Sequence, residues 1–161
     1  MAKGFLNLLV PVDFSEMSEP TIEMAVRVAA KDALVTLLHV VEWLPVLTDG
    51  AFGVYPHRRD IEQLKSLSRA KLEGYARTWP EAQFTVRVSE GKPATCIFEV
   101  AALLRPEIIV IGSHGRSGLD HLLLGSVTER VLRRSDCPVL VVRRTQRVPP
   151  AAPGEMQGAG T

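Results

Sequence analysis

Residues 107–128 read EIIVIGSHGRSGLDHLLLGSVT, and this stretch indicates how the chain folds. It opens with Glu107 to Ile111, a short run that is apolar after its first residue and is expected to form a strand. A glycine-rich segment follows, and a helix is expected from about Ser126 to Arg134. A strand that leads through a glycine-rich segment into a helix is typical of an α/β protein.

The rest of the chain repeats this alternation of strands and helices. Further strands are expected over residues 5–12, 34–41, 84–88 and 138–142. Further helices are expected between them, with apolar faces that run from Ile22 to Ala33, over residues 60–78, and from Ile97 to Leu104. Such alternation implies right-handed crossovers, and therefore an open, doubly wound parallel sheet with helices on both faces.

Composition narrows the class of protein. A chain of 161 residues fits one domain, which we place over residues 1–144, and the Pro/Gly/Ala-rich tail, residues 145–161, is expected to be disordered. Nineteen Lys and Arg against 18 Asp and Glu argue against a dedicated nucleic-acid-binding protein. No apolar run approaches the ~20 residues of a membrane span, no signal peptide is recognisable, and the two cysteines lack metal-site spacing. We therefore expect a cytoplasmic protein that contacts no membrane.

The glycine-rich segment is the strongest chemical signal in the sequence. Glycines such as Gly112 and Gly115 let successive backbone N–H groups converge on phosphate oxygens, and Gly125-Ser126 opens a helix whose first amides bind anions. In parallel sheets, ligands bind beyond the carboxyl ends of the strands. The segment therefore predicts a phosphate site. It is neither a Walker loop nor a dinucleotide fingerprint, because GxxxxGK[ST] and GxGxxG are both absent.

Several of these residues also have a purely structural interpretation. Ser126 and Glu129 have the spacing of a capping box, and the glycines could simply turn the chain. Asp13 could cap the first helix or accept hydrogen bonds from a ribose hydroxyl or a base amine. His39 is expected to be a hydrogen-bonded core histidine, whereas His114 is a better candidate for the site. The connection over residues 43–59 is longer than usual, which predicts either a functional lid or a mobile excursion.

The spacing G-x2-G-x9-G-[ST], formed by Gly112, Gly115, Gly125 and Ser126, resembles the ATP-binding signature of the universal stress protein family. VPVDFS (10–15), LLHVVE (37–42), GKPATCIFEVA (91–101) and SDCPVLVVR (135–143) also resemble segments of that family. The resemblance spans about residues 3–144. It implies a Rossmann-like, five-stranded parallel sheet in the order 3-2-1-4-5.

The resemblance also implies a binding site for ATP, with or without Mg²⁺. Adenine and ribose would lie against Pro11, Val12 and Asp13, with the adenine edge at the backbone of Val40, and Asp13 is the candidate to hold a metal through water. The ribose and phosphates would contact the end of the fourth strand, the glycine-rich segment and the last helix, at Ile111, Gly112, Ser113, His114, Gly115, Arg116, Ser117, Gly125, Ser126 and Val127. AMP, ADP and cyclic nucleotides remain alternatives, since a glycine-rich loop recognises phosphate.

A homodimer is the expected assembly, because the family pairs through its last strand. The resemblance implies pairing by Val139, Leu140, Val141 and Val142. Elementary physics favours the same contact, since a short apolar edge strand without Lys invites another strand.

We therefore expect an ATP-binding, homodimeric stress-response protein with a nucleotide-dependent regulatory or protective role. Phosphoryl transfer needs a positioned nucleophile and cationic stabilisation, and no residue pattern here supplies a general base with an orienting partner. At most slow ATP hydrolysis is expected. Two alternatives stay open, a slow ATPase or nucleotidyl-transfer enzyme of the same fold, and a dimeric interaction module with a vestigial site.

Overall fold

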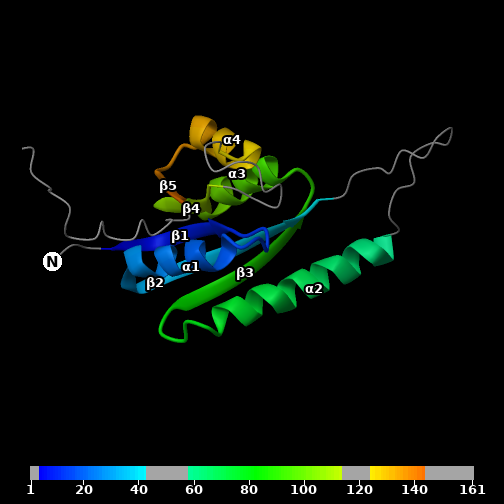
Figure 1. The fold of residues 1–161 in the computed structure, drawn as a ribbon, viewed down its shortest axis with the longest axis horizontal. Coiled ribbons are helices and arrows are strands. Elements are labelled where there is room, and N and C mark those ends of the chain that lie inside the picture. The colour runs from blue at the N-terminus through cyan, green and yellow to red at the C-terminus, as the bar shows by residue number, and fades with distance from the viewer. Residues whose placement is uncertain (1–3, 43–57, 114–123, 144–161) are drawn as a thin grey trace, which may run out of the picture.

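The computed structural model describes residues 4–42, 58–113 and 124–143. Its centre is one five-stranded sheet in the order β3-β2-β1-β4-β5, in which every pairing is parallel (Figure 1). The strands are β1 (Phe5–Pro11), β2 (Ala29–Val41), β3 (Gln83–Glu90), β4 (Ile108–Gly112) and β5 (Val139–Val142). The predicted doubly wound α/β fold is confirmed, with the strand order that the family resemblance implied.

Helices cover both faces of the sheet. The helices are α1 (Ser18–Val28), α2 (Arg58–Ala76), α3 (Pro93–Leu104) and α4 (Ser126–Arg134). Figure 1 shows α1 and α2 on one face, with α3 and α4 on the other. Alternate residues of β1 face opposite sides of the sheet. Leu8 therefore packs in the core beneath α1 and α2, while Leu9 packs with α3 and α4. Both leucines are fully buried, so β1 is the central strand of the fold.

The first helix is shorter than its apolar spacing predicts. The spacing continues to Ala33, yet α1 ends at Val28 and β2 begins at Ala29. Ala29 has an extended backbone and pairs with Phe5, after which the register shifts before Asn7. Pairing with β1 therefore competes with helix propagation. Strand pairing prevails here although alanine is the strongest helix former, so a tertiary contact overrides local propensity.

Gly4 explains how closely β1 and β2 approach at this point. A Cβ atom on Gly4 would lie 2.6 Å from the backbone carbon of Ala29 and 2.6 Å from the nitrogen of Ala30. We expect Gly4→Ala to lower the free energy of unfolding by about 1–3 kcal/mol, measured by urea denaturation, because backbone must move to accept the methyl group. Gly74→Ala is the control, since a Cβ atom there would lie 3.9 Å from the flexible Arg77 guanidinium and a helical alanine should stabilise the protein by about 0.5–1 kcal/mol. An unchanged midpoint for Gly4→Ala would contradict the close approach.

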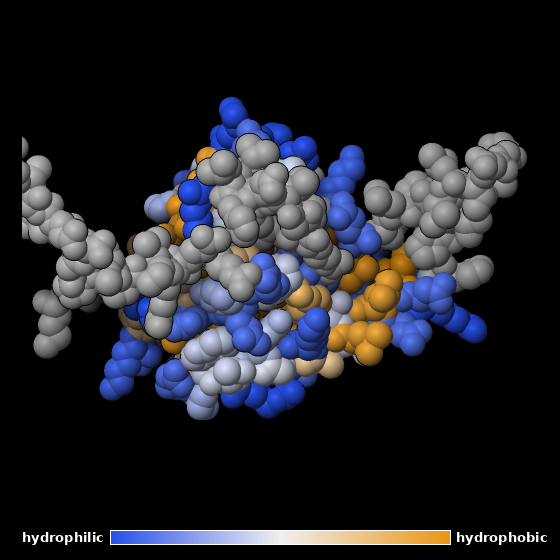
Figure 2. Space-filling view, viewed as in Figure 1, coloured by the Kyte–Doolittle hydropathy of each residue, from blue (hydrophilic) through white to orange (hydrophobic). Residues whose placement is uncertain are grey.

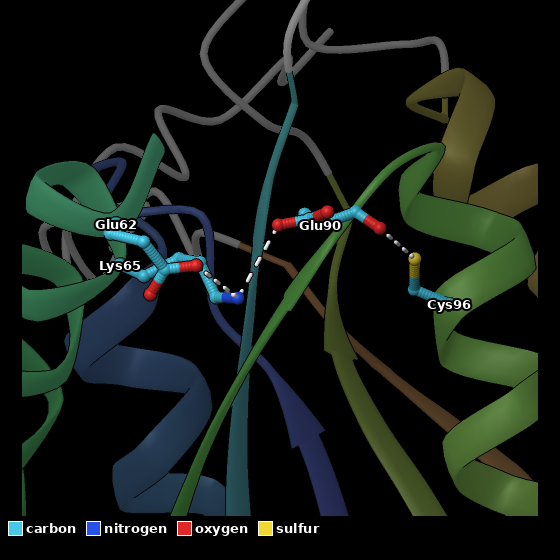
Figure 3. Close-up of polar contacts among 4 residues, drawn as sticks. All are labelled: Glu62, Lys65, Glu90 and Cys96. Carbon is cyan, nitrogen blue, oxygen red and sulfur yellow. Dashed lines mark hydrogen bonds and ion pairs between the residues drawn. The ribbon is translucent and has the colours of Figure 1, made fainter. Parts of the chain in front are cut away.

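Polar contacts connect α2, β3 and α3 (Figure 3). The Lys65 ammonium lies 3.3 Å from a carboxylate oxygen of Glu62 and 3.3 Å from one of Glu90. These hydrogen bonds, to Glu62 first and then Glu90, raise the pKa of Lys65. The backbone carbonyl of Glu90 accepts a hydrogen bond from the Cys96 thiol at 3.4 Å. Lys65 is half-buried but both glutamates are exposed, so the pairs contribute little to stability but fix where α2 passes the end of β3.

Two expectations fall on parts of the chain that the structure does not describe. One is the expected disorder of the tail, residues 145–161. The other concerns the long connection, of which residues 43–57 lie outside the described ranges. Among the described helices, none combines the length and apolarity that a membrane span requires.

Candidate functional site

A cavity of about 290 Å³ opens at the carboxyl ends of β1, β2 and β4. It lies where the chain, having gone outward from β1 to β2 and β3, returns to the other side of β1 to form β4. That reversal is the switch point at which parallel sheets bind ligands. The cavity therefore lies where the sequence predicted a site.

Most of the predicted contact residues meet in this cavity. They come from the end of each neighbouring strand and from the start of α4, and the ones in the lining are Pro11, Val12, Asp13, Val40, Ile111, Gly112, Gly125, Ser126 and Val127. Ser113 is buried and is not in the lining. The other four, His114, Gly115, Arg116 and Ser117, lie outside the described residues.

Three helices begin at the cavity. Ser18, Pro93 and Ser126 are the first residues of α1, α3 and α4, and all three line it. Each helix N-terminus carries about half a positive charge, and unpaired amide groups there bind anions. The cavity is therefore suited to a ligand with negative charge, although only some of its lining is polar.

Sequence analysis missed a second group of lining residues. They are Met17, Ser18, Thr21, Leu38, His39, Glu42, Pro93, Ile97 and Thr128. Most belong to the starts of α1 and α3, which reach the cavity because each crossover helix begins at the carboxyl edge of the sheet. The rule that places ligands at that edge could have named these helix starts, whereas the choice of side chain depends on packing between distant segments.

The start of α4 differs from the expected capping box. Gly125 is the residue before the helix and Ser126 is its first helical residue, so Ser126 does not cap it. Gly125, as the N-cap residue, makes no side-chain capping bond to α4. Glu129 instead pairs with Arg133 at 3.0 Å. The capping-box interpretation of Ser126 is therefore wrong, and the first amides of α4 lie at the cavity without a cap from the N-cap side chain.

Hydrogen bonds hold the start of α4 against the end of β4. The Thr128 hydroxyl donates to the Gly112 carbonyl at 2.7 Å, and the Gly125 amide donates to the Ser113 carbonyl at 2.8 Å. The Ser113 amide donates to the Val142 carbonyl of β5, also at 2.8 Å. Through these two backbone hydrogen bonds, Ser113 connects the start of α4 to β5.

Removing the Thr128 hydroxyl tests this attachment. We expect Thr128→Val, which keeps the side-chain shape, to lower the free energy of unfolding by about 1–2 kcal/mol, because the Gly112 carbonyl loses a donor in a half-buried place. Thr128→Ser keeps the hydroxyl and is the matched control. Urea denaturation measures both variants, and an unchanged midpoint for Thr128→Val would show that the hydroxyl contributes nothing.

Asp13 shapes the turn that leads from β1 into α1. Its carboxylate accepts hydrogen bonds from the Ser15 amide at 3.0 Å and the Ser18 hydroxyl at 3.5 Å. The N-cap of α1 is Met17, so Asp13 organises the turn rather than the helix cap itself. The same carboxylate is half-buried in the cavity lining. Its structural role and a role toward ligand are therefore compatible.

His39 is the buried, hydrogen-bonded histidine that the sequence predicted. It is 4% exposed, and its Nδ1 lies 2.7 Å from the carbonyl oxygen of Val12. Because a carbonyl only accepts, Nδ1 carries the proton in this contact. The bond fixes the backbone of Val12 at the cavity, so the core histidine also supports the site.

Metal binding was predicted only through Asp13 and water. In the described ranges, no group of three or more His, Cys, Asp or Glu side chains is placed to hold a metal ion. Mg²⁺ commonly binds through one or two carboxylates together with substrate phosphates. Asp13 in the cavity lining fits that mode.

Residues 4–143 match the universal stress protein family. Universal stress protein MJ0531 of Methanocaldococcus jannaschii is 31% identical over 147 residues, which cover 89% of this chain and 85% of that protein. Universal stress protein YxiE of Bacillus subtilis is 35% identical over 150 residues, covering 86% and 99%. The solved structure of hypothetical protein MJ0577 has a TM-score of 0.69 at 28% identity, covering 88% of this chain and 99% of that one.

Proposed function

Since the chain belongs to the universal stress protein family, we propose that its cavity binds ATP and that nucleotide occupancy serves a stress-response role. The observation that carries this proposal is the start of α4. Gly125 and Ser126 bring helix amides without a side-chain cap into the same cavity as Gly112. Uncapped helix amides beside a glycine turn are a phosphate-binding arrangement.

The adenosine part of the ligand would contact a different part of the lining. Pro11, Val12 and Asp13 come from the end of β1, and Val40 comes from β2 beside it. We assign adenine and ribose to this side, with the Val40 backbone at the adenine edge and the Asp13 carboxylate available to a ribose hydroxyl. When Mg²⁺ accompanies ATP, Asp13 would hold it through water and the metal would offset phosphate charge.

Relatives of the same fold bind adenine nucleotides. Solved structures at 22% and 20% identity are described as a universal stress protein in complex with cAMP and as one from Archaeoglobus fulgidus in complex with dAMP. At these identities the two structures show the fold alone. The case for a triphosphate in this chain rests on its own cavity.

Amide chemical shifts test the assignment of the phosphates. Titrating ATP into ¹⁵N-labelled protein should shift the amides of Gly125, Ser126 and Val127, which line the cavity at the start of α4. Adenosine, which lacks phosphates, should shift Val12 and Val40 while leaving these three nearly unchanged. AMP and cAMP distinguish the shorter ligands. ATP-induced shifts confined to residues outside the cavity would contradict the proposal.

We also propose that the protein forms a homodimer through β5. This strand ends the sheet, and three of its four residues, Val139 to Val141, are half-buried apolar side chains. An apolar edge strand exposes unpaired backbone groups to a second copy. Sedimentation velocity should give a dimer for the native chain and a monomer for Leu140→Lys, with circular dichroism showing that the variant is folded. A monomeric native chain would contradict this part of the proposal.

A further inference from the structure

A second cavity, also of about 290 Å³, lies between α2 and the ends of β1 and β2. Its lining includes Phe14 from the turn after β1, Val41 from β2, and Leu64, Leu67 and Lys71 from α2. Among the described residues, it shares only His39 and Glu42 with the cavity proposed for ATP. Its size is at the lower end of what small-molecule sites need.

Much of this second cavity is apolar and reaches the surface. Leu64 is 48% exposed and Leu67 is 61% exposed, although both lie on the same side of α2 as the cavity. Figure 2 shows apolar side chains gathered where the N-terminal half of α2 passes the end of β2. Apolar side chains that gather at the mouth of a cavity indicate a binding surface for an apolar group.

The second cavity also has a cation at its edge. The Lys71 ammonium lies 4.4 Å from the centre of the Phe14 ring, and it forms no salt bridge within the described part of the chain. Lys65, six residues earlier on α2, is already bonded to Glu62 and Glu90 (Figure 3). Lys71 is therefore the lysine available to an anionic ligand, with Glu42 as the one carboxylate of the lining.

Phe14 adopts a backbone conformation that needs an explanation. Its φ of 64° is in the left-handed region, which costs a residue with a side chain roughly 1–2 kcal/mol. The conformation places its ring 4.1 Å from the His39 ring and beneath Lys71. Strained residues of this kind are concentrated at ligand sites. Here the strained conformation places the Phe14 ring in the lining of the second cavity, next to the Lys71 ammonium.

We propose that the second cavity binds a small amphipathic carboxylic acid. The carboxylate pairs with Lys71, and the hydrocarbon part lies against Val41, Leu64 and Leu67. This inference is independent of the proposed ATP site, since Phe14, Lys71 and the leucines do not line that cavity.

Decanoate is the probe, titrated into the full chain by calorimetry below its micelle concentration. We expect saturable binding of about one molecule per chain, and affinity that rises by up to about fourfold per methylene from hexanoate through octanoate to decanoate. Decyltrimethylammonium has a similar tail and the opposite charge, so it should bind at least about tenfold more weakly. Equal or tighter binding of the ammonium compound would assign the site to Glu42 and overturn the proposal.

Substitutions locate the probe. Lys71→Gln should weaken decanoate binding by about tenfold, while Lys71→Arg keeps the charge and should retain it. Lys31→Gln removes an exposed lysine at the other end of β2 and should change nothing. Gly125→Val, placed in the ATP cavity, should leave decanoate binding intact, so failure of the ATP proposal is distinguished from failure of this one.

Three results would overturn the inference. The first is the absence of saturable decanoate binding to the folded chain, and the second is binding that Lys71→Gln leaves unchanged. The third is occupation of the cavity by protein instead of ligand, which methyl NMR of Leu64 and Leu67 detects. Shifts that depend on protein concentration without ligand would assign the cavity to a second copy, and nuclear Overhauser contacts to residues 43–57 would assign it to the chain itself.

Discussion

Gly125→Val should weaken ATP binding by at least about tenfold while the fold stays intact. Gly125 lines the cavity and precedes the first helical residue of α4, with φ −59° and ψ 146°. Valine adopts these angles without strain, so the variant should fold. Its branched side chain would instead occupy space that the phosphates need and shield the amides of Ser126 and Val127. Equilibrium dialysis with radiolabelled ATP measures the dissociation constant.

The control for this variant is Gly74→Val in α2. A Cβ at Gly74 meets only the flexible Arg77 side chain at 3.9 Å, far from the ATP cavity, so ATP affinity should not change. If the dissociation constant of Gly125→Val for ATP is within about twofold of the native value, the start of α4 does not contribute to ATP binding.

Ile109→Ala should produce the largest loss of stability, about 2–5 kcal/mol. Ile109 is 0% exposed in β4, pairs with Leu9 on one side and Val139 on the other, and packs in the core beneath α3 and α4. Truncation to alanine leaves a cavity between β4, α3 and α4, and all three would have to shift to fill it. Urea denaturation measures the change in the free energy of unfolding.

Leu6→Ala is the matched control for this loss. Leu6 lies on β1, the strand that pairs with β4, yet it is 54% exposed, so its truncation should change the free energy of unfolding by no more than about 0.5 kcal/mol. Similar losses for the two variants would contradict the burial of Ile109 in the core beneath α3 and α4.

The fold could be predicted from sequence because its strongest patterns are local. The apolar run at 108–111 forms β4, and the helix expected from Ser126 to Arg134 has those bounds in the structure. The end of α1 could not be placed, because the pairing of Ala29 with Phe5 joins segments that are distant in sequence. Alanine-rich segments leave that competition to tertiary contacts.

The candidate site could be predicted in part for the same reason. Gly112 and Gly125 are recognisable from the spacing of the glycines, and the switch-point rule predicts that both lie at one edge of the sheet. The loss of the Ser126 capping box was not predictable, since it depends on a one-residue choice of where α4 begins. The contribution of Thr21 and Ile97 depends on how α1 and α3 pack, which no spacing in the sequence reveals.

Calorimetric titration of ATP into nucleotide-free protein, with and without Mg²⁺, tests the central claim most directly. We predict saturable binding near one ATP per chain, lost or strongly weakened in Gly125→Val. Folded, nucleotide-free protein that binds no ATP would contradict the claim. The uncapped start of α4 beside Gly112 would then be structural, and the function of the chain would reside elsewhere on its surface.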